Sequence, residues 1–433
     1  MQTPIISNGY TLLTGKMAQR GYLGVLDQAV VSGSNFFTAV ILGRYVAPAE
    51  FGVFVLAWTT LMIALSVQNA LVCTPMSVIG AQKPESESAT YWGSLMIFQV
   101  LLGIGICLII VAGYVFLKNI PGLSVSQPSS FPLISATILS CFFLLGQEFF
   151  RRLLIVRLDL KETLINDVVT HSIRIGGMLF LLYAGILNTI NSLLIISAGL
   201  AIGAAFGYFR LFNAIAVSVG KFRHDFFESW RFGRWVLAEM LPYTLSVQGY
   251  IYLTALLIGT QATAALGASQ NILNATNILL LSFSNIMTPI AARRYSTGGN
   301  KALTALMMKA GLLLAVPILG FYIVAMVFAE EILNFVYKLN YAGYGSLIII
   351  CSLYFIVSYF NRMLQVMLYA KKKPDIGFWA KMLSLAVMAV IAYPMIEIFG
   401  VYGAATGTVI SQIVILFGLL FYLFGARRSE RPV

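Results

Sequence analysis

Charged residues are scarce in this chain of 433 residues. Only 10% are Asp, Glu, Lys or Arg, 59% are hydrophobic, and the mean hydropathy is +0.87. Ordinary soluble domains are about 25% charged, because a chain folded in water needs polar side chains to cover its surface. The composition therefore excludes a soluble fold of this length. Long hydrophobic stretches separated by short polar loops predict a polytopic helical membrane protein.

Histidine and cysteine are also rare. The two histidines, His171 and His224, are not spaced with cysteines as metal ligands are, so we expect no metal site and no cofactor. A phosphate-binding loop of the Gly-x-x-x-x-Gly-Lys-Ser/Thr type is absent, so ATP is not the expected energy source. The polar segment 1–21 shows no cleavable signal pattern. The cysteines fall inside hydrophobic stretches, which favours packing roles for Cys73, Cys107, Cys141 and Cys351.

Twelve stretches are long enough to cross a membrane as helices. A hydrocarbon core about 30 Å thick needs roughly 20 apolar residues per helix. The predicted spans are 22–44, 51–78, 91–117, 132–156, 164–184, 190–212, 232–258, 264–290, 303–329, 344–370, 376–397 and 401–424. Several tyrosines lie near the ends of these spans and are expected in interfacial belts: Tyr91, Tyr183, Tyr208, Tyr337, Tyr341 and Tyr344.

Lysine and arginine gather on one side of these spans. With the N-terminus in the cytoplasm, the inner side holds 23 of the 28 basic residues, and only Arg44, Lys118 and Lys338 fall outside. This bias predicts that both termini are cytoplasmic. The net charge of +12 is then explained by topology and by contact with anionic phospholipids, not by nucleic-acid binding. The inner set is Lys16, Arg20, Lys83, Arg151, Arg152, Arg157, Lys161, Arg210, Lys221, Arg223, Arg231, Arg234, Arg293, Arg294, Lys301, Lys309, Lys371, Lys372, Lys373, Lys381, Arg427, Arg428 and Arg431.

The two halves of the chain resemble each other. The segment 150–156 matches 360–366 at an offset of 210, and the same offset places His171 on Lys381. Thr74-Pro75 likewise has a counterpart in Thr288-Pro289. An even number of helices in each half makes the repeats parallel, which is an architecture of alternating-access transporters.

These observations predict an all-α membrane protein with twelve transmembrane helices in two parallel six-helix lobes around a central cavity. The predicted segments are a cytoplasmic N-terminal segment (1–21), a first lobe (22–212), a cytoplasmic inter-lobe loop (213–231), a second lobe (232–424) and a cytoplasmic tail (425–433).

The span 164–184 contains the most informative charged cluster. Asp167, His171 and Arg174 are spaced by four and three residues, which places them on one helical face. A central arginine costs roughly 2.5–3.5 kcal/mol in a membrane helix, so this face should line a cavity or contact another helix. In one interpretation, Asp167 neutralises His171 or Arg174 in a structural network. In the other, Arg174 binds a phosphate or a sugar carboxylate, and His171 couples transport to protons.

Other polar residues within the spans complete the set of candidates. Arg362 is the second lobe's candidate anion contact. Glu148 is expected to form a local ion pair with Arg151 and Arg152. Further candidates for substrate binding are His171, Asn35, Gln68, Asn271, Asn274 and Asn277. The last three form a three-spaced amide ladder that can line a sugar path or bond between helices. The candidates for ion coupling are Asp27, Asp167, His171 and Glu239.

Three prolines interrupt helical runs and are candidate gates: Pro75, Pro242 and Pro289. Each removes a backbone hydrogen bond and kinks its helix. A plain packing bend explains such a kink equally well.

The segments Leu26–Phe36 (LDQAVVSGSNF) and Arg44–Gly52 (RYVAPAEFG) resemble the first hairpin of bacterial polysaccharide flippases. These are the O-antigen and exopolysaccharide translocases of the multidrug/oligosaccharidyl-lipid/polysaccharide exporter superfamily. The resemblance implies a flippase, not an enzyme, that moves a lipid-linked (polyprenyl diphosphate) oligosaccharide from the cytoplasmic to the outer leaflet of the bacterial inner membrane. It also implies a cationic cavity, which suits Arg174 and Arg362.

The resemblance leaves alternatives open. A multidrug/cation antiporter of the same superfamily would need acidic cavity residues, for which Asp27 and Glu239 are candidates. A membrane-embedded polysaccharide polymerase or ligase would need a large outer loop, which the sequence does not offer. We expect a monomer among membrane phospholipids, with an H⁺ or Na⁺ gradient as candidate energy source and other polysaccharide-assembly proteins as candidate partners.

Overall fold

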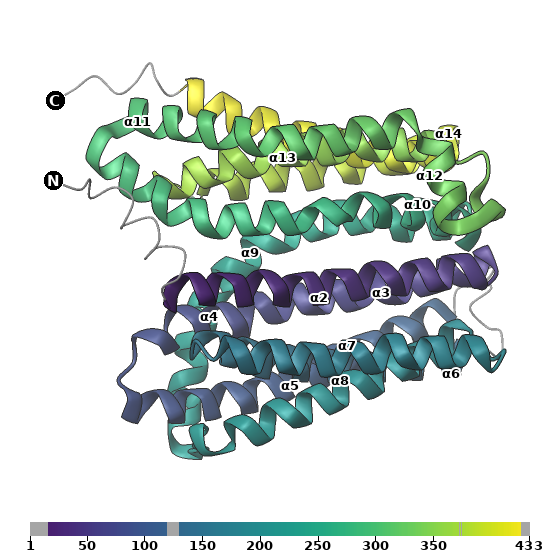
Figure 1. Ribbon diagram of the computed structural model, residues 1–433. Coiled ribbons are helices and arrows are strands. Elements are labelled where there is room, and N and C mark those ends of the chain that lie inside the picture. The colour runs from purple at the N-terminus through teal and green to yellow at the C-terminus, as the bar shows by residue number, and fades with distance from the viewer. Residues whose placement is uncertain (1–15, 119–129, 372, 374, 426–433) are drawn as a thin grey trace, which may run out of the picture. The chain divides into compact units, whose positions relative to one another are not determined.

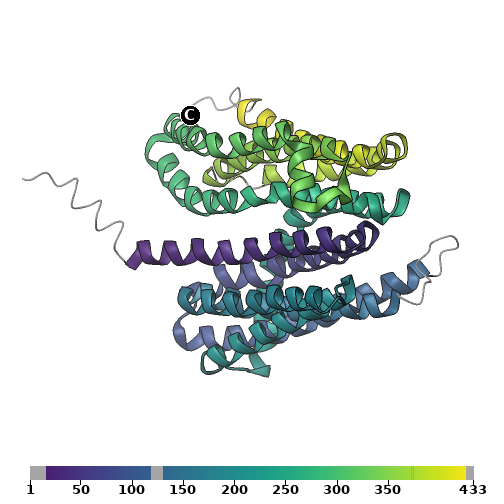
Figure 2. The same cartoon turned by 45° about the vertical axis from the view of Figure 1, so that its right-hand side comes forward.

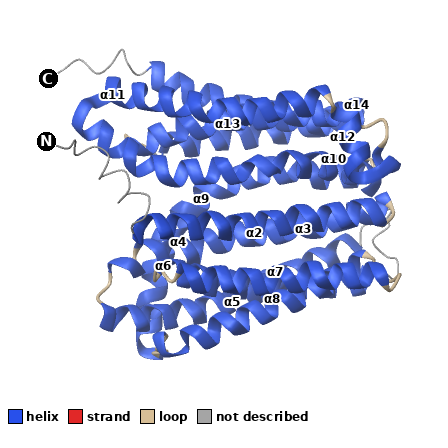
Figure 3. Cartoon of the chain, in the orientation of Figure 1, coloured by secondary structure: helices blue, strands red, loops and turns tan. Residues whose placement is uncertain are grey.

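A computed structural model describes residues 16–118, 130–371, 373 and 375–425, and all regular secondary structure in these ranges is helical (Figure 3). The all-α prediction is confirmed. The helices of the first half are α2 (Lys16–Tyr45), α3 (Pro48–Gln68), α4 (Thr74–Val78), α5 (Glu85–Lys118), α6 (Ser130–Val156), α7 (Leu160–Tyr183) and α8 (Thr189–Leu211). The helices of the second half are α9 (Val219–Leu257), α10 (Thr260–Leu273), α11 (Asn277–Val327), α12 (Ala329–Tyr337), α13 (Gly345–Ala370) and α14 (Asp375–Gly425).

Two glycines divide the longest helices. Gly299 in α11 has φ 62° and Gly400 in α14 has φ 60°. Glycine tolerates this left-handed conformation because it has no Cβ, and a helix cannot continue straight through it. Each of these two elements is therefore two helical segments joined at a kink. With α3 and α4 counted as one segment and α10 as continuing into α11, the described residues contain twelve long helical segments, which agree with the predicted spans.

Eight helical stretches among the described residues are long and apolar enough to cross a membrane. One of them, Asp375–Leu423, contains two of the predicted spans. The helices of three predicted spans, α7, α9 and α10, are not among these eight stretches. The helix α10 is only 14 residues long, and α7 and α9 carry charged side chains. Three of the helices that hold candidate polar residues, α7, α9 and α10, are thus less apolar than most of the other long helices.

The described residues form two compact units. The first lies within Met1–Thr38 and Val67–Arg234, and the second within Ala39–Ser66 and Trp235–Val433. In the first unit, α8 packs against α6 and α7, and α5 packs against α6; Figures 1 and 2 show these helices side by side. In the second unit, α13 packs against α10, α11 and α14.

Part of the expected inter-lobe loop is helical. Residues 219–231 form the first turns of α9, which runs on into the predicted seventh span. Phe226 on this stretch packs edge-on against Phe98 of α5, with ring centroids 4.8 Å apart. The hydroxyl groups of Ser229 and Tyr91 form a hydrogen bond of 2.8 Å. Tyr91 was expected in an interfacial belt, but its side chain is buried. The stretch is helical because its aromatic residues repeat with helical spacing and cover a neighbouring helix.

The second segment of the hairpin that resembles polysaccharide flippases, Arg44–Gly52, is closely packed within the second unit. A Cβ at Gly52 would lie 1.8 Å from the carbonyl oxygen of Thr260, so α3 and α10 touch backbone to backbone there. Phe51 packs against Tyr337 and Tyr341, with ring centroids 6.3 Å apart in each pair. These two tyrosines were expected in an interfacial belt, but they are buried, because the short helix α12 folds them back onto the hairpin.

The candidate prolines lie in three different settings. Pro75 is buried at the start of α4, directly after a π-helical turn, Asn69–Cys73, that interrupts the helix. A π turn of this kind accommodates the loss of the backbone hydrogen bond that proline, which has no N–H, cannot donate. Pro242 is buried inside α9, and Pro289 is exposed inside α11. Their role as gates stays a prediction.

Candidate functional site

In the first unit, the Arg151 guanidinium lies among three carboxylates. Its Nε donates to Asp167 Oδ2 at 2.5 Å, and its Nη2 donates to Asp27 Oδ2 at 2.6 Å. Its Nη1 is 3.4 Å from Glu148 Oε2. The side chain of Arg151 is 13% exposed and that of Asp167 is 0% exposed, so these ion pairs are largely withdrawn from water. They join α6 to α2 and α7.

The partners of Arg151 go beyond the sequence-based expectation. Arg151 was counted on the inner side of the membrane, and it lies in α6, inside the predicted span 132–156 and one turn after Glu148. The expected local ion pair of Glu148 is confirmed, because Glu148 also accepts from Arg152 at 3.1 Å. The hydrophobic flanks of Arg151 made it look like the end of a span, and only the neighbouring helices supply its buried carboxylates.

The candidate face of α7 is buried. Gln147 donates to the second oxygen of Asp167 at 3.0 Å, so both oxygens of this carboxylate are engaged. Arg174 is 4% exposed and donates to Asn35 Oδ1 at 2.8 Å. The Nδ1 atom of His171 is buried without a hydrogen-bond partner among the described residues. This geometry provides the pairing of Asp167 that a structural network requires, with Arg151 as the partner; the anion-binding role of Arg174 stays a prediction.

The second unit contains a cavity of about 340 Å³ between α9, α11, α13 and α14. Its wall combines ionic, amide, hydroxyl and apolar side chains. The lining residues that bear on its chemistry are Glu239, Tyr243, Arg362, Gln365, Tyr369 and Lys381, with Asn361 and Gln412 beside them. Glu239 and Tyr243 lie one turn apart on α9, and Arg362, Gln365 and Tyr369 follow one face of α13.

Glu239 is the centre of the polar network in this cavity. Its Oε1 atom accepts from Lys381 Nζ at 2.9 Å and from the Tyr369 hydroxyl at 3.0 Å. Gln365 Nε2 lies 3.4 Å from the same atom. The side chains of Lys381 and Glu239 are 12% and 20% exposed, so the pair is largely shielded. Lys381 was counted among the inner basic residues, near the start of the predicted span 376–397, and the first turns of α14 place it in the wall of the cavity.

Arg362 is the second cation of the cavity. It lines the wall beside Gln365 and Tyr369. An anion contact in the second lobe, the role predicted for Arg362 from the sequence, needs such a position on a cavity wall. Within the described residues it makes no hydrogen bond or ion pair. Asn361, its neighbour, donates to Gln412 Oε1 at 2.8 Å and is held against α14. With Lys381 and Arg362 against one carboxylate, Glu239, in the count of charges, the ionic groups of the wall sum to a positive charge.

The remaining candidate residues lie apart from this cavity. Gln68 is fully buried and donates to Gln99 and to the Leu145 carbonyl oxygen at 2.9 and 2.6 Å. Asn271 donates to the Tyr337 hydroxyl at 3.0 Å, which is an interhelical bond. The amide ladder is interrupted, because residues 274–276 form a 3₁₀ turn between α10 and α11. Asn274 is exposed and Asn277 is half-buried.

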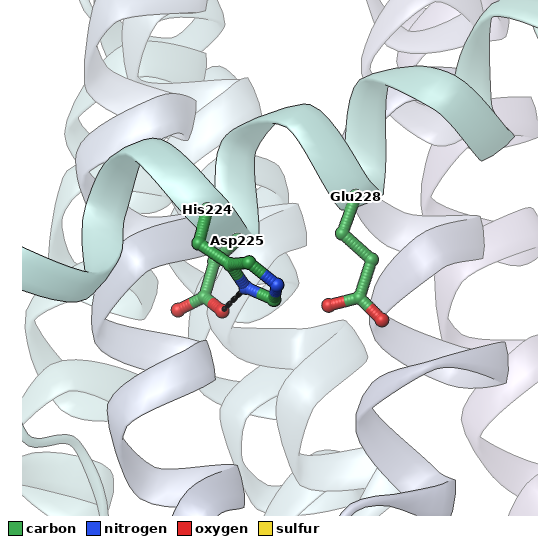
Figure 4. Close-up of side chains that lie close together, drawn as sticks. All are labelled: His224, Asp225 and Glu228. Atoms are coloured by element: carbon green, nitrogen blue, oxygen red, sulfur yellow. Dashed lines mark hydrogen bonds and ion pairs between the residues drawn. The ribbon is translucent and has the colours of Figure 1, made fainter.

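One group in the described part of the chain has three ligand-type side chains close together. His224, Asp225 and Glu228 extend from α9 toward a common space, with their ligand atoms within 4.8 Å of one another (Figure 4). Two of the three are already engaged: Ser94 donates to Asp225 at 2.7 Å, and Lys83 donates to Glu228 at 2.9 Å. The group therefore fastens α9 to α5 and to the segment that precedes α5. The absence of a metal site stays a prediction.

Sequence reasoning missed two members of these sites as functional residues, Arg151 and Lys381. Both were explained by the positive-inside rule. For Lys381 a signal was present, since the offset of 210 residues that relates the halves places it on His171, a candidate residue, just as it places Arg362 on Arg152. For Arg151 the signal was its position one turn from Glu148 within an otherwise apolar stretch.

Comparison with known proteins shows a likeness in structure. No protein-family model and no curated protein sequence matches the chain. An inward-facing multidrug resistance MATE family transporter of the MOP superfamily has a TM-score of 0.73 at 14% identity, over 93% of this chain and 96% of that one. The outward-facing conformation of such a transporter gives 0.67 at 13% identity, over 94% of each chain.

A MOP superfamily transporter from Pyrococcus furiosus is also similar, with a TM-score of 0.58 at 14% identity over 96% of this chain and 94% of that one. Its structure was described as having a binding pocket of reverse polarity that suggests a different function. The chain therefore has the multi-pass helical fold of these membrane proteins. The predicted fold class, an all-α membrane protein of twelve helices, is confirmed.

Proposed function

We propose that the protein is an alternating-access transporter that flips a lipid-linked oligosaccharide across the bacterial cytoplasmic membrane. The fold is that of transporters seen in both inward-facing and outward-facing conformations, which supports alternating access by two repeated lobes. The resemblance of the first hairpin to polysaccharide flippases supports the substrate class. In this proposal both termini are cytoplasmic, and the two lobes comprise residues 22–212 and 232–424.

The observation that carries the substrate class is the charge of the cavity in the second unit. The wall holds two cations, Arg362 and Lys381, and a single carboxylate, Glu239, which pairs with Lys381. A shielded wall with a surplus of positive charge attracts anions, and guanidinium and ammonium groups are the usual partners of phosphate. The diphosphate of a polyprenyl carrier is such an anion. Amides and tyrosines in the same wall are suited to bind sugar hydroxyls.

The second candidate is a multidrug or cation antiporter, which the names of the similar structures favour. Such a protein needs a carboxylate available to a cationic substrate. Here four buried or half-buried carboxylates, those of Asp27, Glu148, Asp167 and Glu239, each have a basic partner within 3.4 Å. This pairing favours the flippase.

The test is transport by the purified protein in proteoliposomes. A fluorescent polyprenyl-diphosphate sugar is placed in both leaflets, and a membrane-impermeant quencher reports how much of it can reach the outer leaflet. We expect protein-dependent loss of the protected fraction, and no accumulation of a lipophilic cation under an imposed pH gradient. Accumulation of the cation without any flipping of the glycolipid would support the antiporter instead.

A further inference from the structure

We propose that the cavity in the second unit is a diphosphate subsite in which the ligand competes with Glu239 for Lys381. The inference deepens the proposed function and rests on it for the identity of the ligand. In this inference Lys381 and Arg362 bind the two phosphates. Glu239 competes with the ligand for Lys381 and so lowers the affinity of the subsite for the diphosphate.

The donors of Lys381 are only partly used. An ammonium group has three N–H donors, and Glu239 Oε1 accepts one of them at 2.9 Å. The ring of Tyr243 lies 5.9 Å from the same nitrogen, which adds a weak cation–π contact and no hydrogen bond. Lys381 can therefore turn from Glu239 toward an incoming anion without a change in the backbone.

Arg362 supplies the second half of the subsite. It comes from α13, whereas Lys381 comes from α14, and its guanidinium makes no hydrogen bond within the described residues. Five N–H donors in a planar fork match the two terminal oxygens of a phosphate. Two cations from two helices of one wall suit a ligand with two adjacent phosphates better than a single phosphate.

The size of the cavity limits which part of the substrate it can hold. A volume of about 340 Å³ lies at the lower end of the roughly 300–1,000 Å³ that small-molecule sites occupy. A complete oligosaccharide does not fit. The wall also contains apolar residues, Met240, Ile415 and Leu419, which suit the first carbons of an isoprenoid chain. The occupant we assign is therefore the isoprenyl diphosphate at the reducing end of the glycolipid.

Glu239 makes this subsite weaker than its two cations alone would. An anion that binds Lys381 must break the ion pair between Lys381 and Glu239. It must also come close to the negative charge of Glu239, in a wall where little water screens the repulsion. The carboxylate is held in place by Tyr369, at 3.0 Å, so it remains close to the ligand. Weak binding serves a transporter, because a substrate held too tightly is not released on the other side. Removing the charge of Glu239 should tighten binding.

The test measures binding to the full-length protein in phosphatidylcholine nanodiscs. The probe is farnesyl diphosphate, and farnesol serves as the uncharged comparison. We expect Lys381→Met and Arg362→Met to weaken binding of the diphosphate about tenfold each, the equivalent of one charge-assisted hydrogen bond. Glu239→Gln should tighten it by roughly threefold or more, since the competing charge is gone. Farnesol binding should change in none of them.

The matched control is Lys309→Met, which removes an exposed lysine of α11 outside the cavity. A variant that merely misfolds loses affinity for the diphosphate. An increase in affinity in Glu239→Gln therefore cannot result from a damaged fold. Unchanged or weaker binding by Glu239→Gln, or equal effects of Lys381→Met and Lys309→Met, would overturn the inference. So would competition by phosphatidylglycerol as strong as that by inorganic pyrophosphate, because the site would then serve ordinary phospholipids.

The transport assay separates this inference from the proposed function. If the binding pattern holds and no glycolipid is flipped, the diphosphate subsite stands and the proposed function fails. If glycolipid is flipped and Glu239→Gln binds no more tightly than wild type, the function stands and the competition is wrong.

Discussion

Arg151 Nε lies 2.5 Å from Asp167 Oδ2, a carboxylate with no exposed surface, and the same guanidinium reaches Asp27 at 2.6 Å. One side chain of α6 thus neutralises buried charges on two other helices. Buried ion pairs of this kind add little net stability, but removing one partner leaves an uncompensated charge and is strongly destabilising.

We therefore predict that Arg151→Met destabilises the protein by about 3–5 kcal/mol, the usual effect of breaking a buried ion pair. The measurement is the amount of folded protein and its thermal unfolding in detergent. Arg152→Met, which removes a more exposed partner of Glu148, is the control and should have a much smaller effect. Asp167→Asn combined with Arg151→Met should recover part of the loss. Equal stability of Arg151→Met and wild type would contradict the network.

Close packing at Gly52 gives a second prediction. Gly52→Ala should destabilise the protein by at least about 1–3 kcal/mol, the usual penalty of overpacking, because the new Cβ meets the Thr260 carbonyl oxygen at 1.8 Å and neither backbone can move freely. Thermal unfolding measures the effect. Gly33→Ala lies in the same hairpin with nothing within 4 Å of its Cβ and is the control. If both variants unfold alike, α3 and α10 do not touch as described.

The third prediction concerns Arg174. In the proposed function its guanidinium meets an anionic group of the substrate in one conformation of the cycle. Arg174→Ala should then abolish flipping in proteoliposomes while folded protein remains at the wild-type level, and Arg174→Lys should keep partial activity because the charge remains. Asn35→Ala removes the partner at 2.8 Å without removing charge and is the matched variant. Loss of folded protein in Arg174→Ala would assign Arg174 to structure alone.

The fourth prediction concerns coupling to protons. Three carboxylates, Asp27, Glu148 and Asp167, surround two guanidinium groups, those of Arg151 and Arg152. The network carries one negative charge in excess, which a single proton balances. Within this network, the Oδ1 atom of Asp27 is buried and has no hydrogen-bond partner among the described residues.

We therefore expect Asp27→Asn to abolish the response of flipping to an imposed pH gradient. His171→Gln is measured beside it, because His171 is the other candidate on this face. If His171→Gln loses the response to the pH gradient and Asp27→Asn keeps it, the group that couples transport to protons is the imidazole of His171. Wild-type flipping that ignores the gradient would exclude proton coupling and favour passive or Na⁺-coupled exchange.

Hydropathy alone determined the class of this protein and the position of its helices. A helix in a membrane satisfies its backbone hydrogen bonds within one segment, so each span is encoded by its own residues. For this reason the twelve predicted spans each match a helical segment, most of them closely at both ends; α9 begins well before its span, and the first segment of α11 runs on past the predicted end to the kink at Gly299. Helical spacing likewise determined that Asp167, His171 and Arg174 share a face of α7, since that is a local property.

Only the tertiary structure decided which polar side chains meet. Arg151 contacts Asp27 across 124 residues of sequence, and Lys381 contacts Glu239 across 142. In the sequence both basic residues fit the positive-inside rule, because that rule counts charges by side of the membrane and contains no information on partners. Buried charges are stabilised by whichever opposite charge the packing of other helices brings within about 4 Å. That choice is made between helices, so no single segment encodes it.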